Sequence, residues 1–137
     1  MQNSYDLIII GGGPAGASAA IYAARKRLKT LILAESFGGQ SVVSSDIQNW
    51  IGTVSISGEE LASALKKHME AYAGDVLTLK EEHVNQVQGN NGKFLTTTHK
   101  GSYESRAVLI TAGSRRRKNE AIGADKIEHK GLTYCAS

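Results

Sequence analysis

The first 35 residues alternate between short apolar runs and a glycine-rich turn. Residues 5–10 (YDLIII) form a continuous apolar run, which is typical of a strand buried on both faces of a parallel sheet. An alanine-rich segment with helical composition follows over residues 17–27, and residues 29–35 (KTLILAE) form a second apolar run. The pattern therefore predicts a strand–helix–strand unit over residues 5–35.

A second helix and a third strand are predicted further along the chain. A long glycine- and serine-rich loop covers residues 36–56, and long ordered loops are more often functional than not. Ser57 and Glu60 have the spacing of a capping box, so we expect a helix to begin there. Gly74 predicts its end, and residues 75–79 (DVLTL) predict the strand. Apolar residues follow helical spacing along one face of this helix: Leu61, Leu65, Met69 and Tyr72.

The pattern then changes to strands separated by turns. Turn signals at residues 90–92 (NNG) and 100–101 (KG) predict a three-stranded antiparallel meander over about residues 81–106. The run AVLITAG at residues 107–113 predicts another buried parallel strand. We therefore expect one α/β domain over residues 1–137, with a Rossmann-like parallel sheet and an inserted meander.

Composition limits the class of protein. The chain has 137 residues, 41% hydrophobic and 21% charged, which is typical of one globular domain. No apolar run is long enough to span a membrane, and one cysteine excludes an internal disulfide framework, so we expect a cytoplasmic protein. The net charge of +3 allows an anionic partner such as a nucleotide cofactor.

Nucleic-acid and metal binding are not expected. The basic runs at residues 25–29 (RKRLK) and 115–118 (RRRK) have no aromatic residues between their cations, and aromatic residues make up 6% of the chain. These runs are therefore interpreted as solvated surface. The four histidines show no metal-ligand spacing.

The glycine turn carries the strongest chemical signal. Gly11, Gly13 and Gly16 form G-x-G-x-x-G between a predicted strand and a predicted helix. The first glycine permits a tight turn, the second lets a pyrophosphate approach the backbone, and the third lets the helix pack against the strand. Pro14 suits the first helical position, and Glu35, about 20 residues after the turn, suits a carboxylate that accepts ribose hydroxyls. The context predicts a dinucleotide site, and the inserted meander favours FAD over NAD.

Five segments in order resemble one enzyme family. They are YDLIIIGGGPAGASAAIYAAR, GGQ at residues 38–40, IQNWIG at 47–52, VLITAG at 108–113 and GLTYCAS at 131–137. The array resembles bacterial thioredoxin reductases and the flavoprotein subunit of alkyl hydroperoxide reductase. The chain departs from the family at Ile51, where a proline is usual, and at residues 111–113, where Ala-Thr-Gly is usual.

The resemblance implies an FAD-binding domain that is incomplete relative to the family. It places residues 38–40 around the flavin, Asn49 beside the isoalloxazine ring, Gly113 close to the cofactor, and the backbone of Val84 against adenine. Together with the glycine turn, the expected cofactor-binding residues are Gly11, Gly13, Pro14, Ala15, Gly16, Glu35, Ser36, Gly38, Gly39, Gln40, Asn49, Val84, Thr111, Ala112 and Gly113.

Cys135 is the expected catalytic residue. A lone cysteine is usually an inert, partly buried side chain, but the resemblance makes Cys135 the first sulfur of a C-x-x-C redox pair. The family enzyme passes electrons from NADPH through FAD to this pair and then to a disulfide of a thioredoxin- or peroxiredoxin-like protein, and it is generally a homodimer. Because the pair is incomplete within residues 1–137, we expect this chain alone to lack the full catalytic cycle.

The sequence leaves two other functions open. The first is a non-catalytic FAD- or nucleotide-binding module that dimerises. The second is similarity to the thioredoxin-reductase-like ferredoxin–NADP reductases, which lack the redox dithiol. The Tyr-Cys-Ala context of Cys135 argues against the second.

Overall fold

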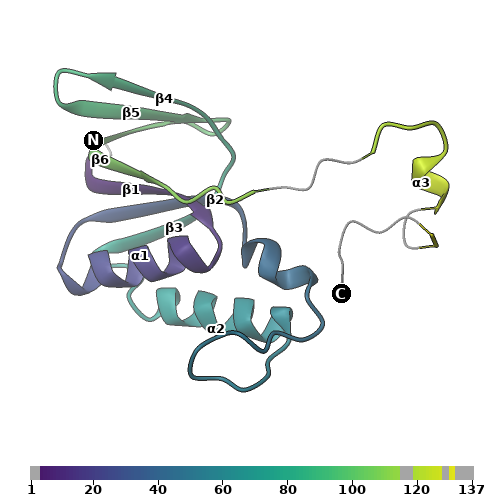
Figure 1. The fold of residues 1–137 in the computed structure, drawn as a ribbon. Coiled ribbons are helices and arrows are strands. Elements are labelled where there is room, and N and C mark those ends of the chain that lie inside the picture. The colour runs from purple at the N-terminus through teal and green to yellow at the C-terminus, as the bar shows by residue number, and fades with distance from the viewer. Residues whose placement is uncertain (1–3, 115–118, 128–129, 132–137) are drawn as a thin grey trace.

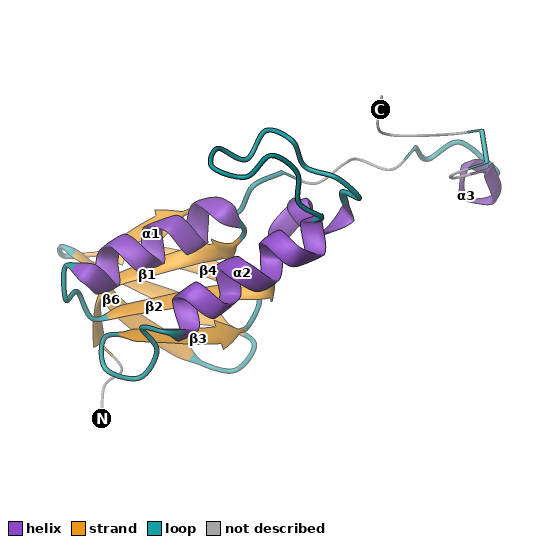
Figure 2. Ribbon diagram, turned by 90° about the horizontal axis from the view of Figure 1, so that it is seen from below, coloured by secondary structure: helices purple, strands orange, loops and turns teal. Residues whose placement is uncertain are grey.

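The computed structural model describes residues 4–114, 119–127 and 130–131. These residues form a mixed sheet with helices on one face (Figures 1 and 2). The elements in chain order are β1 (Ser4–Gly12), α1 (Pro14–Arg25), β2 (Thr30–Phe37), a 3-10 helix η1 (Gly39–Val43), α2 (Gly58–Glu70), β3 (Leu77–Glu81), β4 (Val84–Asn90), β5 (Lys93–Thr98), β6 (Ser102–Ile110) and α3 (Ala124–Ile127).

The six-stranded sheet has the order β3-β2-β1-β6-β5-β4. Strands β3, β2, β1 and β6 pair in parallel, whereas β6, β5 and β4 pair antiparallel. This combination confirms the expected α/β class with an added meander. The chain first moves from β1 to β2 and β3 on one side and later returns to β6 on the other side. The carboxyl end of β1 is therefore a topological switch point, where open α/β sheets bind ligands.

Strand β6 differs from the expectation in two respects. We expected the meander to finish near residue 106, before a separate parallel strand, but β6 runs through this point without a break. Its residues 102–105 pair with β5, and its residues 104–110 pair with β1. Burial was also expected, yet Leu109 is 41% exposed and Ile110 is 68% exposed. Neither residue belongs to the apolar clusters found among the described residues.

Two apolar clusters on opposite faces explain the continuous apolar runs. Successive residues of β1 and β2 point to opposite faces, and Ile8 and Ile9 are both fully buried. One cluster lies between the sheet and the helices: Ile9, Ala17, Ala20, Ile21, Ala24, Ile32, Met69 and Leu77. The other lies on the meander side: Tyr5, Ile8, Leu31, Leu33 and Tyr103.

Helix α2 begins at the predicted capping box. The Ser57 side chain accepts a hydrogen bond from the Glu60 backbone N–H, and the Glu60 carboxylate accepts one from the Ser57 N–H. The helix ends at Glu70 with Ala71 as its C-cap, so Gly74 lies beyond it in the turn before β3. The expected C-cap role of Gly74 is therefore wrong.

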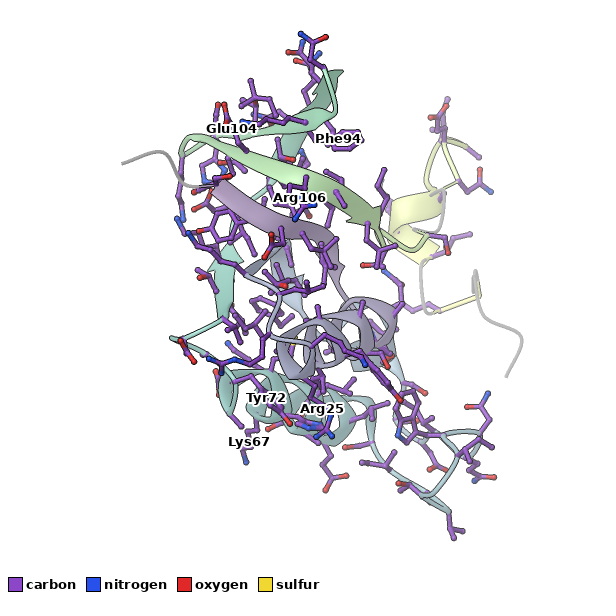
Figure 3. The ribbon with its side chains drawn as sticks, turned by 90° about the vertical axis from the view of Figure 1, so that its left-hand side faces the viewer. Arg25, Lys67, Tyr72, Phe94, Glu104 and Arg106 are labelled. Carbon is purple, nitrogen blue, oxygen red and sulfur yellow. The ribbon has the colours of Figure 1, made fainter. Side chains whose placement is uncertain are left out.

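The two long helices lie side by side on the sheet (Figure 2). Their ends are linked where Arg25 Nη1 donates a hydrogen bond to Tyr72 Oη at 3.5 Å, and Figure 3 shows these two side chains together. Leu61 and Met69 are buried at 3% and 1% exposure, which confirms the predicted apolar face of α2. Helix α1 thus packs on β1 and β2, and α2 packs beside α1.

Candidate functional site

The carboxyl ends of β1, β2 and β6 meet around one cavity of about 690 Å³. The glycine turn after β1 forms one wall, and the connection between β3 and β4 forms another. The lining residues are Ile10, Gly11, Gly12, Gly13, Pro14, Ala15, Leu33, Ala34, Glu35, Ser36, Gly39, Gln40, Ser41, Glu82, His83, Val84, Thr111, Ala112, Gly113 and Ser114.

The first glycine of the turn is needed for its backbone conformation. Gly11 has φ of +120°, a value that residues with a side chain rarely adopt. The turn is also tied to the end of β6, because Thr111 Oγ1 donates to the carbonyl oxygens of Ile10 at 3.0 Å and Gly11 at 3.2 Å. Thr111 therefore holds this turn against the end of β6.

Gly16 and Gly13 are glycines for different reasons. A Cβ at Gly16 would overlap the carbonyl oxygen of Gly11, so α1 can lie this close to β1 only without a side chain there. A Cβ at Gly13 would meet just the Cα of Gly39, at 3.7 Å, an ordinary contact. Packing among the residues that the structure describes thus leaves Gly13 unexplained, whereas a ligand close to the backbone would explain it.

The N-terminus of α1 is open to a ligand. No side chain caps it, no acidic residue lies in its first turn, and Pro14 occupies its start. Helix α2 is the opposite case, since its own serine and glutamate cap it. Unpaired N–H groups and the positive end of the helix dipole attract anions. The α1 N-terminus therefore gives the cavity the chemistry of a phosphate site.

The acidic residue at the end of β2 contacts a histidine across the cavity wall. Glu35 Oε1 pairs with His83 Nδ1, and the two residues are 48 positions apart in the sequence. Their side chains are 42% and 57% exposed. The carboxylate that the sequence assigns to ribose binding is thus held in place by a residue that the sequence analysis did not select.

A buried carboxylate anchors the same wall. Glu82 is 6% exposed and accepts hydrogen bonds from Thr98 Oγ1 at 2.7 Å and from Tyr103 Oη at 3.0 Å. Lys80 Nζ donates to Tyr103 Oη at 2.9 Å and lies 4.0 Å from Glu82. The Glu82 N–H donates to the Ala34 carbonyl at 2.8 Å. These bonds fix the β3–β4 connection against β2 and the meander.

The surroundings of Glu82 lower its pKa. Burial alone raises the pKa of this carboxyl, but hydrogen bonds from Thr98 and Tyr103 and the charges of Lys80 and Lys100 outweigh burial, so the pKa lies below its ordinary value of 4.5. A carboxyl group whose pKa is lower in the folded state than in the unfolded state stabilises the fold at pH values above the unfolded-state pKa. This contribution is lost as the pH falls through the folded pKa.

Acid should therefore weaken the fold partly through Glu82. We expect the free energy of unfolding to fall as the pH drops below about 4.5, the ordinary pKa of a glutamate. Glu82→Gln should reduce this slope without abolishing it, because hydrogen bonds also lower the pKa values of Asp46 and Glu60. Urea unfolding at a series of pH values measures the slope. Equal slopes for the variant and the wild type would rule out Glu82 as a source.

Most of the sequence-predicted cofactor residues line this cavity. Among the fifteen, Gly16, Gly38 and Asn49 do not. Gly16 packs against the turn, the Gly38 N–H donates to the Gly12 carbonyl at 2.8 Å, and Asn49 is exposed outside the cavity. Glu82 and His83 were missed, although they directly precede the selected Val84. Cys135 and the basic run at 115–118 lie outside the described residues.

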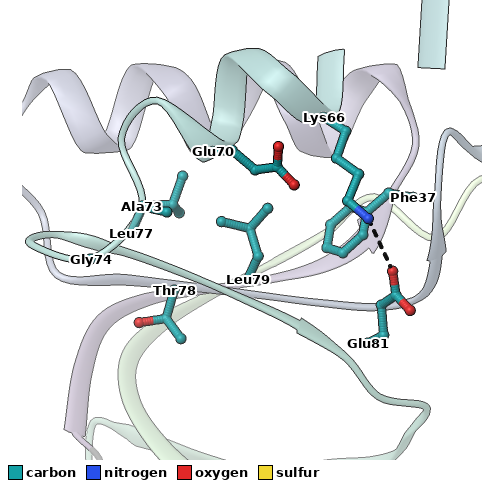
Figure 4. Close-up of a pocket in the computed structure, with 9 residues that line it drawn as sticks. All are labelled: Phe37, Lys66, Glu70, Ala73, Gly74, Leu77, Thr78, Leu79 and Glu81. Carbon is teal, nitrogen blue, oxygen red and sulfur yellow. Dashed lines mark hydrogen bonds and ion pairs between the residues drawn. The ribbon is translucent and has the colours of Figure 1, made fainter. Parts of the chain in front are cut away.

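A second cavity lies away from the strand ends. It measures about 560 Å³ between α2 and β3, where Lys66 Nζ contacts Glu81 Oε1 at 3.4 Å beside Phe37 (Figure 4). It contains no helix N-terminus and no part of the glycine turn. The chemistry of an anionic ligand thus favours the first cavity.

Within the part of the chain that the structure describes, no group of three or more His, Cys, Asp or Glu side chains could hold a metal ion. None of the helices described has the length and apolar character needed to cross a membrane.

Known proteins share both the sequence pattern and the fold. Residues 5–137 match the family described as pyridine nucleotide-disulphide oxidoreductase. An alkyl hydroperoxide reductase subunit of Xanthomonas campestris pv. phaseoli is 34% identical over 135 residues, 98% of this chain and 26% of that protein. A Bacillus subtilis (strain 168) protein named NADH dehydrogenase is 35% identical over 140 residues, 98% of this chain and 26% of that protein.

Solved structures give the same result for the fold. Thioredoxin reductase of Lactococcus lactis in its FR conformation has a TM-score of 0.85 and 30% identity, over 96% of this chain and 43% of that one. Thioredoxin reductase of T. acidophilum has a TM-score of 0.84 and 30% identity, over 98% of this chain and 43% of that one. The chain thus spans 26% of the curated relatives' length and 43% of these structures.

Proposed function

Since the chain belongs to the pyridine nucleotide-disulphide oxidoreductase family, we propose that it is the FAD-binding part of an NADPH-dependent disulfide reductase. The observation that carries this proposal is the uncapped N-terminus of α1, which opens into a cavity that also contains Glu35. Diphosphates bind such N-termini, and a carboxylate at the end of the second strand suits ribose hydroxyls. The open space beside Gly13 supports the fit.

Each part of the cavity then has a role toward FAD. The backbone N–H groups around Ala15 bind the diphosphate, and Glu35 accepts hydrogen bonds from ribose hydroxyls. The backbone of Val84, which lines the cavity, would hold the adenine. The segments around Gln40 and Ala112 would hold the flavin portion and exclude water from it. Bound FAD would supply electron transfer between a nicotinamide and a disulfide.

The whole protein would use this site in a disulfide reduction. NADPH is oxidised to NADP⁺, and a disulfide takes up two electrons and two protons to become two thiols. We propose that Cys135 provides one sulfur of the redox disulfide in a C-x-x-C pair. The proposed final acceptor is a disulfide of a thioredoxin- or peroxiredoxin-like protein, in keeping with the names of the thioredoxin reductase and alkyl hydroperoxide reductase relatives.

Flavin titration tests the binding step. We expect the purified chain to bind FAD with a change in the visible flavin spectrum, and Gly13→Val to weaken FAD binding about tenfold or more, because the valine side chain would occupy the space of the diphosphate. The urea unfolding midpoint should change little, since Gly13 has extended φ and ψ of −77° and −174° and a Cβ there makes only an ordinary contact with the described residues.

A glycine outside the cavity provides the control. Gly89 lies in β4 with the Phe94 ring 3.6 Å from a would-be Cβ, so Gly89→Ala should leave FAD affinity unchanged. Failure of the wild-type chain to bind FAD, or equal affinity for the wild type and Gly13→Val, would overturn the proposal.

A further inference from the structure

His83 occupies a fixed position opposite the end of β2. It lies between β3, which ends at Glu81, and β4, which begins at Val84. Both sides of this short connection are anchored. On the side that precedes His83, the Glu82 carboxylate accepts its buried hydrogen bonds and the Glu81 carbonyl oxygen accepts one from Lys100 Nζ at 3.1 Å. On the side that follows, Val84 pairs with Thr98 of β5. The His83 backbone is therefore held while its ring projects to the cavity wall.

The contact between His83 and Glu35 adds little to stability. Both side chains are substantially exposed, at 57% and 42%, and exposed ion pairs contribute little to the free energy of unfolding. The contact nevertheless lies on the wall of the cavity that contains the glycine turn. Its location therefore points to ligand recognition rather than to folding.

The geometry fits a carboxylate that serves two partners. An ionised carboxylate only accepts hydrogen bonds, so Nδ1 of His83 is the donor to Glu35 Oε1. A carboxylate has about four acceptor positions on its two oxygens. The bond from His83 is therefore compatible with additional bonds from ligand hydroxyls.

We propose that His83 is a positioning residue for ribose recognition, because it orients the Glu35 carboxylate toward the hydroxyls of the adenosine ribose. The inference rests on the proposed function, since it assumes that an adenosine diphosphate group binds this cavity. Restricting the rotation of an acceptor before the ligand arrives lowers the entropy that binding must remove. Loss of the histidine should then weaken recognition of the ribose hydroxyls and leave the rest of the nucleotide site intact.

Two nucleotide probes separate this role from a structural one. ADP carries both ribose hydroxyls, whereas 2′,3′-dideoxy-ADP carries neither. We expect His83→Ala in the 137-residue chain to bind ADP about fivefold more weakly than the wild type, the effect of roughly one hydrogen bond. Affinity for dideoxy-ADP should be the same in both proteins. Calorimetric titration measures all four constants.

Two further variants complete the design. His83→Asn keeps a side-chain N–H close to the place of Nδ1 and should restore most of the ADP affinity. His68 is an exposed histidine on α2 that lines neither cavity, so His68→Ala should match the wild type with both probes.

The outcomes distinguish this inference from the proposed function. If His83→Ala weakens both probes equally, His83 is a structural residue and the inference is wrong. If it weakens neither, the inference is likewise wrong while the nucleotide site stands. If the wild-type chain binds neither ADP nor FAD, the proposed function fails and the role of His83 fails with it.

Discussion

Gly16→Ala should lower the free energy of unfolding by about 2 kcal/mol and remove FAD binding. Two effects oppose each other at this position. Alanine favours a helix over glycine by about 1 kcal/mol, but the added Cβ overlaps the Gly11 carbonyl oxygen. Overpacking of this kind costs about 3 kcal/mol when the neighbour is backbone and cannot rotate away. The cost of the overlap therefore exceeds the gain in helix propensity, and α1 must move away from the turn that it supports.

Urea unfolding and flavin titration measure these two effects. Ser18→Ala is the matched control, because Ser18 is exposed on the same helix and alanine there adds helix propensity without a clash. It should leave stability and FAD affinity at or slightly above the wild-type values. If Gly16→Ala is as stable as Ser18→Ala, the close approach of α1 to the turn does not constrain the sequence.

Glu82→Ala should destabilise the fold by about 3 kcal/mol, because it removes a buried acceptor from several donors at once. The hydroxyls of Thr98 and Tyr103 and the Lys80 ammonium would each lose a partner or a nearby opposite charge. FAD affinity should fall as well, since the β3–β4 connection would lose its anchor beside Val84. Urea unfolding followed by flavin titration tests both effects.

The neighbouring glutamate shows what a surface pair contributes. Glu81 contacts Lys66 at 3.4 Å with both side chains about half exposed. Glu81→Ala should therefore change the free energy of unfolding by about 1 kcal/mol at most. Similar losses for Glu81→Ala and Glu82→Ala would contradict the role given to the buried network.

Local sequence patterns predicted the elements whose signals lie within a few consecutive residues. The apolar run, the glycine turn and the alanine-rich helix gave β1 and α1 because each signal is contained within a few residues. The capping box gave the start of α2 for the same reason. The continuity of β6 was missed, because its polar positions, such as Glu104 and Arg106, resemble a break between two strands. In the structure they face away from the core, with Arg106 Nη1 3.6 Å from Asp6.

The cavity residues also divide into those that local sequence spacing predicted and those that it did not. Glycines and Glu35 could be predicted because their spacing follows from one strand–helix–strand unit. The hydroxyl donors to the Glu82 carboxylate, Thr98 and Tyr103, come from strands that begin more than ten residues later. His83 is 48 residues from Glu35. No periodicity in a single sequence reports such pairings. Glu81 and Glu82 are neighbours of the same residue type, and only the fold separates the exposed one from the buried one.

The continuity of β6 has a consequence for the order in which the chain can fold. Thr111 and Ile10, which close the glycine turn onto the end of β6, are 101 residues apart in the sequence. The chain loses conformational entropy when a loop of this length closes, and this loss comes before the new contacts stabilise the fold. Such nonlocal pairing therefore slows folding. During synthesis from the N-terminus, β1 can pair with β2 early but stays unpaired on its other edge until β6 has left the ribosome. The cavity at the carboxyl ends of β1, β2 and β6 is therefore completed late, after the meander has been made.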